Sequence, residues 1–182
     1  MKPFLFSSLL FLLLPLCSRA QQPAITPRGM ALPVVNMEEV ETTPVGTRVG
    51  EVSVTDVSGR NWQLNRLRGK VVFLYCFAVD SAINSNTAAE LNELVEKFAD
   101  SAAVFLALSP DRFSEMAQCG GNAFLKCPVA YQQSEALEKL AITTFPAVVV
   151  LNKKGRIAAW QDATHSGIVK EQEALLYKLL RK

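Results

Sequence analysis

Val71-Val72-Phe73-Leu74-Tyr75-Cys76-Phe77 is the stretch of sequence that decides the fold. Apolar residues follow one another here without a polar break, and β-branched and aromatic side chains predominate. A half-exposed strand would alternate apolar and polar residues, whereas a continuous run is typical of a strand buried on both faces. We therefore expect a central strand over Lys70–Ala78, with other elements packed on each side of it.

Helical and strand patterns alternate around this central strand. Period-two alternation predicts strands, whereas apolar residues at i, i+3, i+4 and i+7 predict helices. Strands are expected at 51–55, 62–64, 103–108, 127–130, 147–151 and 156–160. Helices are expected at 91–98, from Pro110 to Gly120, around 137–140 and over 168–179. This order predicts an α/β fold with a central mixed β-sheet flanked by helices on both faces.

The N-terminus has the pattern of an export signal. Lys2 is followed by the apolar run Phe4–Leu16, and Ser18-Arg19-Ala20 places small residues where a signal peptidase reads them. We expect residues 1–20 to be a signal peptide cleaved near Ala20, which makes the protein periplasmic or secreted. The run is too short for a spanning helix of about 20 apolar residues. Lipid attachment at Cys17 is the alternative interpretation.

The rest of the chain divides into an arm and a domain. Residues 21–47 are rich in proline and lack a sustained periodicity, which indicates an extended linker before a domain over 48–182. Removal of Lys2 and Arg19 leaves 17 basic side chains against 17 acidic ones. A balanced charge predicts no nucleic-acid partner, and we expect membrane contact only if Cys17 is lipidated.

Four motifs in order resemble one known family. They are Ser58-Gly59-Arg60 with Leu67-Arg68-Gly69-Lys70-Val71-Val72, then Leu108-Ser109-Pro110-Asp111, Thr143-Thr144-Phe145-Pro146 and Lys154-Gly155-Arg156-Ile157. The set resembles the redoxin branch of thioredoxin-like proteins, which includes the AhpC/TSA peroxiredoxins and the exported TlpA/ResA-type thiol-disulfide oxidoreductases. The resemblance implies a thioredoxin-like fold from about Val49 onward. It also implies a cis-proline loop at Phe145-Pro146.

The cysteines that this family uses are missing from their usual place. If the alignment is counted from Lys70, a TlpA-type pair of cysteines would fall on Ser81 and Asn84. If Asp80 is matched to the peroxiredoxin pattern, the peroxidatic cysteine would fall on Ser85. If the alignment is anchored on Glu90, the pair would fall on Asn84 and Thr87. Every one of these positions is a serine, asparagine or threonine. A hydroxyl is a far weaker acid than a thiol and forms no reversible disulfide. The resemblance therefore implies the frame of a redox site without its usual nucleophile.

The cis-proline loop has two interpretations. In the family it presents backbone groups to a substrate chain beside the active thiol, but a cis X-Pro bond also sets the geometry of a turn. With the thiols absent we favour the structural role for Pro146. Phe145 departs from the smaller residue often found before this proline, and it offers an apolar contact surface instead.

The remaining cysteines suggest a structural bridge. In an oxidising compartment Cys119 and Cys127 would close a short loop, and we expect a disulfide between them. A redox-active pair and free thiols remain alternatives. Cys76 lies within the central strand, where a cysteine behaves as a small inert hydrophobe.

No other residue suggests catalysis or a cofactor. His165 is the single histidine, expected in the loop before the last helix, so neither a metal site nor another cofactor is predicted. Glu90, Glu93 and Glu96 are expected on the solvated side of their helix, without a catalytic role. Our leading hypothesis is an exported, non-catalytic binding or scaffold domain with an unknown protein partner in the envelope or extracellular space. The competing hypothesis is a thiol-disulfide oxidoreductase that works through Cys119 and Cys127 in cell redox homeostasis.

Overall fold

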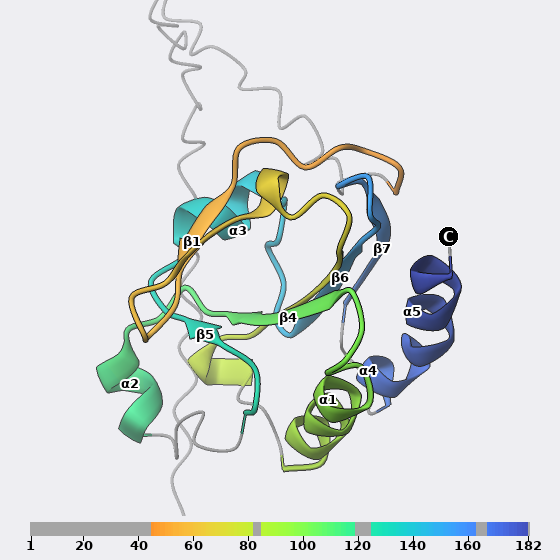
Figure 1. Cartoon of the computed structure of the whole chain (residues 1–182). Helices are drawn as coiled ribbons and strands as arrows, with labels where there is room; N and C mark the ends of the chain where they lie inside the picture. The colour runs from red at the N-terminus through yellow and green to blue at the C-terminus, as the bar shows by residue number, and fades with distance from the viewer. Residues whose placement is uncertain (1–44, 82–84, 119–124, 163–166, 182) are drawn as a thin grey trace, which may run out of the picture. The chain divides into compact units, whose positions relative to one another are not determined.

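A computed structural model describes residues 45–81, 85–118, 125–162 and 167–181. The predicted mixed sheet is confirmed: it has five strands in the order β5-β4-β3-β6-β7 (Figure 1). The strands are β3 (Val71–Cys76), β4 (Ala103–Leu108), β5 (Val129–Ala130), β6 (Ala147–Leu151) and β7 (Ile157–Asp162). Strands β3, β4 and β5 run parallel, while β6 and β7 are antiparallel to their neighbours.

The central strand is buried as expected, and its side chains alternate between two apolar layers. Val72, Leu74 and Cys76 belong to one layer, and Val71, Phe73 and Tyr75 to the other. All six residues of β3 are buried, because β4 and β6 pair with its edges while other elements cover its faces. The continuous apolar run is thus explained by the position of the strand in the middle of the sheet.

Helices cover both faces of the sheet, as the element order predicted. The first layer packs against α3 (Ser134–Lys139) and a separate two-stranded sheet, β1 (Ser53–Thr55) with β2 (Asn61–Gln63). The second layer receives apolar residues from α1 (Ser85–Lys97), α2 (Phe113–Gln118), α4 (Ile168–Glu171) and α5 (Glu173–Leu180). Figure 1 shows α1, α4 and α5 together on one side of the sheet and α3 on the other. Two 3₁₀ turns, η1 (Leu64–Arg66) and η2 (Val79–Ser81), precede and follow β3.

Helix α1 begins at Ser85, six residues before its predicted start at Leu91, and two further helices differ from their predicted bounds at polar side chains. Helix α2 begins at Phe113, not at Pro110, and Asp111 does not cap it: its carboxylate accepts a hydrogen bond from Val79 N–H. The last helix is divided at Gln172, which is buried and donates its side-chain amide to Gln161. In both places a polar side chain takes a long-range partner that apolar periodicity does not report.

Gly46 and Thr47, which were assigned to the arm, are hydrogen-bonded to the domain. Gly46 N–H donates to the Ile157 carbonyl at 2.8 Å, and Ile157 N–H donates to the Thr47 carbonyl at 2.9 Å. These bonds attach the end of the proline-rich arm to the first residue of β7. Within the parts of the chain that the structure describes, no helix is both long and apolar enough to cross a bilayer.

Candidate functional site

The carboxyl ends of the parallel strands meet at one edge of the sheet, which we call the mouth. Cys76, Leu108 and Ala130 end β3, β4 and β5 there, and Ala147 begins β6 beside Cys76. The described loops of the mouth are residues 77–81, 109–112 and 143–146. Ligands of open α/β sheets bind outside the carboxyl ends of strands, so this edge is the candidate site.

Ser81, one of the positions matched to a family cysteine, lies at the mouth with its hydroxyl already engaged. Its Oγ accepts a hydrogen bond from Ala78 N–H at 3.1 Å and donates to the Ala78 carbonyl at 3.2 Å. Both contacts close the turn that leads from β3 into η2. A hydroxyl held in a local turn has neither the acidity nor the freedom of a nucleophile.

The other matched positions cluster at the start of α1. Ser85 is the first residue of the helix and Thr87 is half-buried in its first turn, while Asn84 lies outside the described residues. Ser85 and Thr87 therefore lie at a helix N-terminus, where the backbone dipole would acidify a thiol. The structure does not choose between the three alignments, but the residue types give none of them a thiol.

Phe145 and Pro146 form the predicted cis-proline loop at the opposite side of the mouth. The peptide bond between them is cis, and the next residue, Ala147, pairs with Cys76 across β6 and β3. The Phe145 ring packs against the first apolar layer. Its backbone N–H and carbonyl have no hydrogen-bond partner among the residues described.

The two described thiols are buried. Cys76 is 0 % exposed although it lies next to the mouth, and burial raises the pKa of its thiol far above the ordinary value. Cys127 is 5 % exposed, and burial raises its pKa to about 12. Burial thus disfavours the thiolate at both cysteines, and the buried position expected of Cys76 in the central strand is confirmed.

The predicted Cys119–Cys127 disulfide stays a prediction. Cys127 is a free thiol in the structure, whereas Cys119 lies outside the described residues. His165 also lies outside them. Across the described ranges, no group of three or more His, Cys, Asp or Glu side chains is placed to hold a metal ion.

Glu90 differs from its expected place on the solvated side of α1. It is half-buried, and its Oε2 is buried without a hydrogen-bond partner in the described part of the chain, whereas Glu93 and Glu96 are exposed as predicted. Burial, and then the charges of Cys76 and Glu90, raise the pKa of Tyr75 on β3. Glu90 lies three residues after Thr87 and four before buried Leu94, so the three share one helix face. This spacing in the sequence could have predicted that Glu90 is partly buried.

A pocket of about 560 Å³ lies beside the mouth. It is lined by Thr55, Asp56, Val57, Phe113, Tyr131, Gln132 and Gln133. Asp111 joins it to the mouth, because its carboxylate accepts from Val79 N–H at 2.7 Å and its carbonyl accepts from Gln132 N–H at 2.9 Å. Sequence reasoning missed this pocket, since it combines three segments that are far apart in the chain.

The rim of this pocket is apolar, and one buried hydroxyl in its lining lacks a hydrogen-bond partner within the described structure. Val57 is 61 % exposed and Phe113 is 59 % exposed, and both are large apolar side chains open to solvent. The Phe113 ring lies 5.5 Å from the Tyr131 ring, edge to face. Tyr131 is buried, and its hydroxyl lacks a hydrogen-bond partner within the described structure. Exposed apolar side chains around a concave site are typical of a binding surface.

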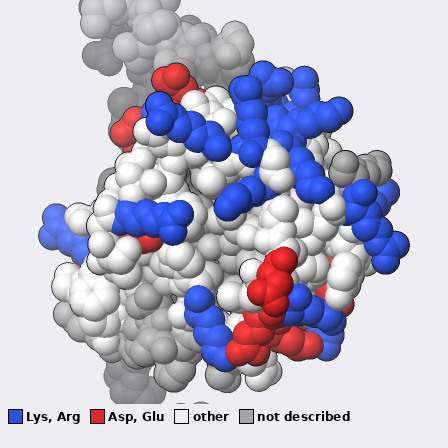
Figure 2. All heavy atoms as spheres, viewed as in Figure 1, with Lys and Arg blue, Asp and Glu red and all other residues white. Residues whose placement is uncertain are grey.

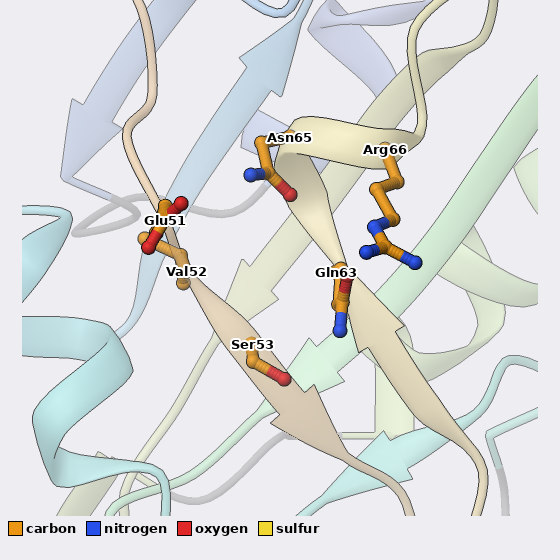
Figure 3. Close-up of a pocket in the computed structure, with 6 residues that line it drawn as sticks. All are labelled: Glu51, Val52, Ser53, Gln63, Asn65 and Arg66. Atoms are coloured by element: carbon orange, nitrogen blue, oxygen red, sulfur yellow. The ribbon is translucent and has the colours of Figure 1, made fainter.

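A second pocket, of about 370 Å³, lies away from the mouth (Figure 3). Glu51, Val52 and Ser53 line one side of it, and Gln63, Asn65 and Arg66 line the other. Its lining is mainly polar and holds no nucleophile with a neighbouring base. We assign it no catalytic role.

A mixed five-stranded sheet with a cis-proline loop beside the first parallel strand defines a thioredoxin-like protein. The AhpC/TSA family profile matches residues 45–160, which is more than half of the chain. The chain therefore belongs to the AhpC/TSA family, and the redoxin branch expected from its motifs is confirmed. A comparison with curated proteins gives no match.

Several solved structures share the fold. A proposed thiol:disulfide interchange protein, DsbE, from Chlorobium tepidum superimposes with a TM-score of 0.64 at 13% identity, covering 75% of this chain and 98% of that one. A proposed protein disulfide isomerase from Bacteroides thetaiotaomicron gives 0.63 at 15% identity, with coverages of 77% and 92%. A thiol-disulfide oxidoreductase from Bacteroides fragilis gives 0.59 at 19% identity, with coverages of 71% and 100%. At these identities the likeness shows the fold alone.

Proposed function

We propose that this chain is an exported redoxin-family protein that binds extended polypeptide at its mouth without thiol chemistry. The observation that carries the proposal is the combination at one edge of the sheet of an intact cis-proline loop with a serine whose hydroxyl is used internally. We interpret this combination as the binding frame of the family without an accessible thiol among the residues that the structure describes.

The backbone of Phe145 supports binding of an extended chain. Its N–H and carbonyl lack partners among the described residues and stand at the start of β6. An extended peptide that lies along this loop would gain main-chain hydrogen bonds, which provide affinity without demanding a particular sequence. The exposed Phe113 and Val57 at the neighbouring pocket would then receive an apolar side chain of the same peptide.

The binding test uses a polypeptide that cannot react through sulfur. Residues 21–182 contain every described residue of the fold, and reduced, carboxymethylated α-lactalbumin is unfolded and has neither free thiols nor disulfides. We expect saturable binding that is insensitive to reducing agent, measured by fluorescence anisotropy. Absence of binding, or reduction of insulin disulfides at rates typical of thioredoxins, would contradict the proposal.

A matched pair of variants locates the binding surface. Phe113→Ser removes an exposed ring at the pocket rim and is expected to weaken binding at least about tenfold, or about 1.4 kcal/mol. Val45→Ser removes a comparably exposed apolar side chain, at 64 % exposure, from outside the pocket lining and should leave binding unchanged. Equal effects of the two substitutions would exclude the pocket.

The second candidate function is thiol-disulfide exchange through Cys119 and Cys127. The names of several structural neighbours favour this activity, but the burial of Cys127 and its pKa of about 12 oppose it. An active pair would trap mixed disulfides with partner proteins in the Cys127→Ser variant, as seen on non-reducing gels. A bridge that resists glutathione would exclude this function.

Export and the disulfide are tested in one experiment. The N-terminal pattern supports cleavage near Ala20 and release from the cytoplasm. Peptide mass mapping of the exported protein under non-reducing conditions would report an N-terminus at Gln21 and a Cys119–Cys127 linkage. Retention of residues 1–20 would contradict cleavage, and an acyl group on Cys17 would establish the lipid-anchored alternative.

A further inference from the structure

We propose that the end of the sheet opposite the mouth docks on a membrane surface with anionic lipid headgroups. The docking surface, here the basic face, consists of Arg48, Arg66, Arg68, Lys70, Lys153, Lys154 and Arg156. Figure 2 shows Lys and Arg side chains gathered at the end of the molecule where Figure 1 places residues 45–52, η1 and the β6–β7 turn.

The fold itself brings these cations together from three separate segments. Arg48 forms an isolated β-bridge with Arg156. Gly69 N–H donates to the Lys153 carbonyl at 2.8 Å, which places the loop before β3 against the β6–β7 turn. Since Lys70 directly precedes β3 at this end and Cys76 ends the strand at the mouth, the basic face and the mouth lie at opposite ends of one strand.

The basic face is exposed and is not neutralised within the described structure. Six of its seven cations are exposed, and Lys153 is half-buried. The side-chain ion pairs seen in the described residues join Lys97 to Glu173, Lys126 to Glu96 and Lys139 to Glu135. None of them involves the basic face. Acidic side chains gather mainly toward α1, although Glu51 lies in the pocket that Arg66 also lines, so the near-zero net charge of the mature chain conceals an uneven distribution of charge (Figure 2).

The place where the arm joins the domain favours a membrane over other anionic partners. Arg156 Nη1 donates to the Gly46 carbonyl at 2.9 Å, so the arm leaves the described domain within the basic face. In the lipid-anchored alternative, in which Cys17 is retained, the arm therefore connects the anchor to this face. A single apolar or acyl anchor gives only marginal membrane binding, and a polybasic surface is the usual second attachment. An anchored arm would present these cations to the headgroups and direct the mouth away from them. The proposed contact is made by the domain itself, whereas the expectation that membrane contact requires a lipidated Cys17 stays a prediction.

The test is co-flotation of residues 21–182 with vesicles. This chain retains Glu38, Glu39 and Glu41, which precede the described residues and oppose the attraction, so the measurement includes their effect. We expect binding to vesicles of phosphatidylcholine with about 30 % phosphatidylglycerol, no binding to phosphatidylcholine alone, and at least about a tenfold loss between 50 and 500 mM NaCl because salt screens exposed charges.

Two charge-matched variants separate the basic face from general electrostatics. Arg66→Gln/Arg68→Gln/Lys154→Gln removes exposed cations from the face and should abolish flotation. Arg112→Gln/Lys139→Gln/Lys170→Gln removes the same charge elsewhere and should retain it. Equal loss in both variants would overturn the proposal. So would binding that ignores lipid charge, or tighter binding of poly-glutamate or duplex DNA than of the anionic vesicles. Binding of carboxymethylated α-lactalbumin is measured in parallel, and its persistence in the Arg66/Arg68/Lys154 variant keeps this test independent of the proposed function.

Discussion

At the scale of single residues, the chemistry of the mouth is decided by acidity. A hydroxyl at Ser81 forms a turn with Ala78, whereas the thiols of Cys76 and Cys127 are protonated because they are buried. Electron exchange requires a thiolate that is both accessible and stabilised. Among the described residues no side chain meets both requirements: the positions matched to the family cysteines carry no sulfur, and Cys76 and Cys127 are buried from solvent.

Cysteines returned to the start of α1 should restore reactivity. In the Asn84→Cys/Thr87→Cys variant we expect a thiol pKa below the ordinary value of about 8.5, because the helix N-terminus stabilises the anion. The measurements are the pH dependence of alkylation by iodoacetamide and the rate of insulin reduction. The Ser81→Cys/Asn84→Cys variant tests the alternative alignment. If neither variant acquires an acidic thiol or any reductase activity, the frame of the site is not intact.

The buried thiols should make the fold sensitive to alkali. Cys127 has a folded-state pKa of about 12, so in the unfolded chain its thiol ionises first as the pH rises. The stability that it contributes is complete below the unfolded pKa of about 8.5 and is lost above it, at up to about 1.4 kcal/mol per pH unit. Urea unfolding at pH 8 and pH 10 in reducing agent measures the loss. A Cys127→Ala variant should lose less stability over this interval, and an identical loss would refute the argument.

At the scale of elements, the turn between β1 and β2 is organised by one carboxylate. Asp56 Oδ1 accepts hydrogen bonds from Ser58 N–H at 2.8 Å and Arg60 N–H at 3.1 Å, and Oδ2 accepts from Trp62 Nε1 at 2.8 Å. The Arg60 guanidinium lies 3.8 Å from the centre of the Trp62 ring. The side chain thus joins both strands of the small sheet to the first apolar layer.

Replacement of Asp56 should weaken this element in a pH-dependent way. Burial acts to raise the pKa of Asp56, but hydrogen bonds from Ser58, Trp62 and Arg60 outweigh it and lower the pKa. The stability is therefore present above the unfolded pKa of about 3.9 and is lost as the pH falls through the lower folded value.

In the Asp56→Asn variant an amide N–H₂ group faces hydrogen-bond donors that the carboxylate accepted from. We expect the free energy of unfolding to fall by about 1–3 kcal/mol at pH 7, and by less toward pH 3. Urea unfolding at both pH values is the measurement. The exposed Asp100 provides the control, since Asp100→Asn should change stability little at either pH. Equal stability of wild type and Asp56→Asn at pH 7 would contradict the role of the carboxylate.

Elements that depend on local pattern could be predicted from the sequence, while those that depend on distant partners could not. The apolar run of β3, the helix face of Leu91 and Leu94 and the β6–β7 turn all have signals within a few residues. The late start of α2 depends on Asp111 bonding to Val79 across the mouth. Of the candidate site, the cis-proline loop and the missing cysteines were predictable, but the pocket rimmed by Phe113 was not.

At the scale of the whole molecule, stability should be concentrated in the inner strands. Every residue of β3 and β6 is buried, and each of these strands has hydrogen-bonded neighbours on both edges. Strand β5 has two residues and lies at the end of the sheet. The net charge of the chain, in contrast, does not report where the charged residues lie. The basic face could therefore not be predicted from the sequence, because the fold brings together Arg48, the 66–70 loop and the β6–β7 turn.

Hydrogen exchange should report this gradient. We expect amides of β3 and β6 to exchange only through global unfolding, whereas those of β5 and α2 exchange through smaller openings that require less free energy. Native-state exchange followed by mass spectrometry at increasing urea concentrations measures both classes. Faster exchange in β3 than in β5 would show that the sheet does not unfold from its edge.

The extended geometry of β3 fixes the distance between the basic face and the mouth. A strand of six residues at about 3.3 Å per residue spans about 20 Å, and its full burial prevents it from bending or shortening. Whatever holds the arm end of this domain would therefore keep its cis-proline loop at a constant height, facing outward. Under that arrangement the length of the sheet sets the minimum distance between the anchoring surface and a polypeptide bound at the mouth.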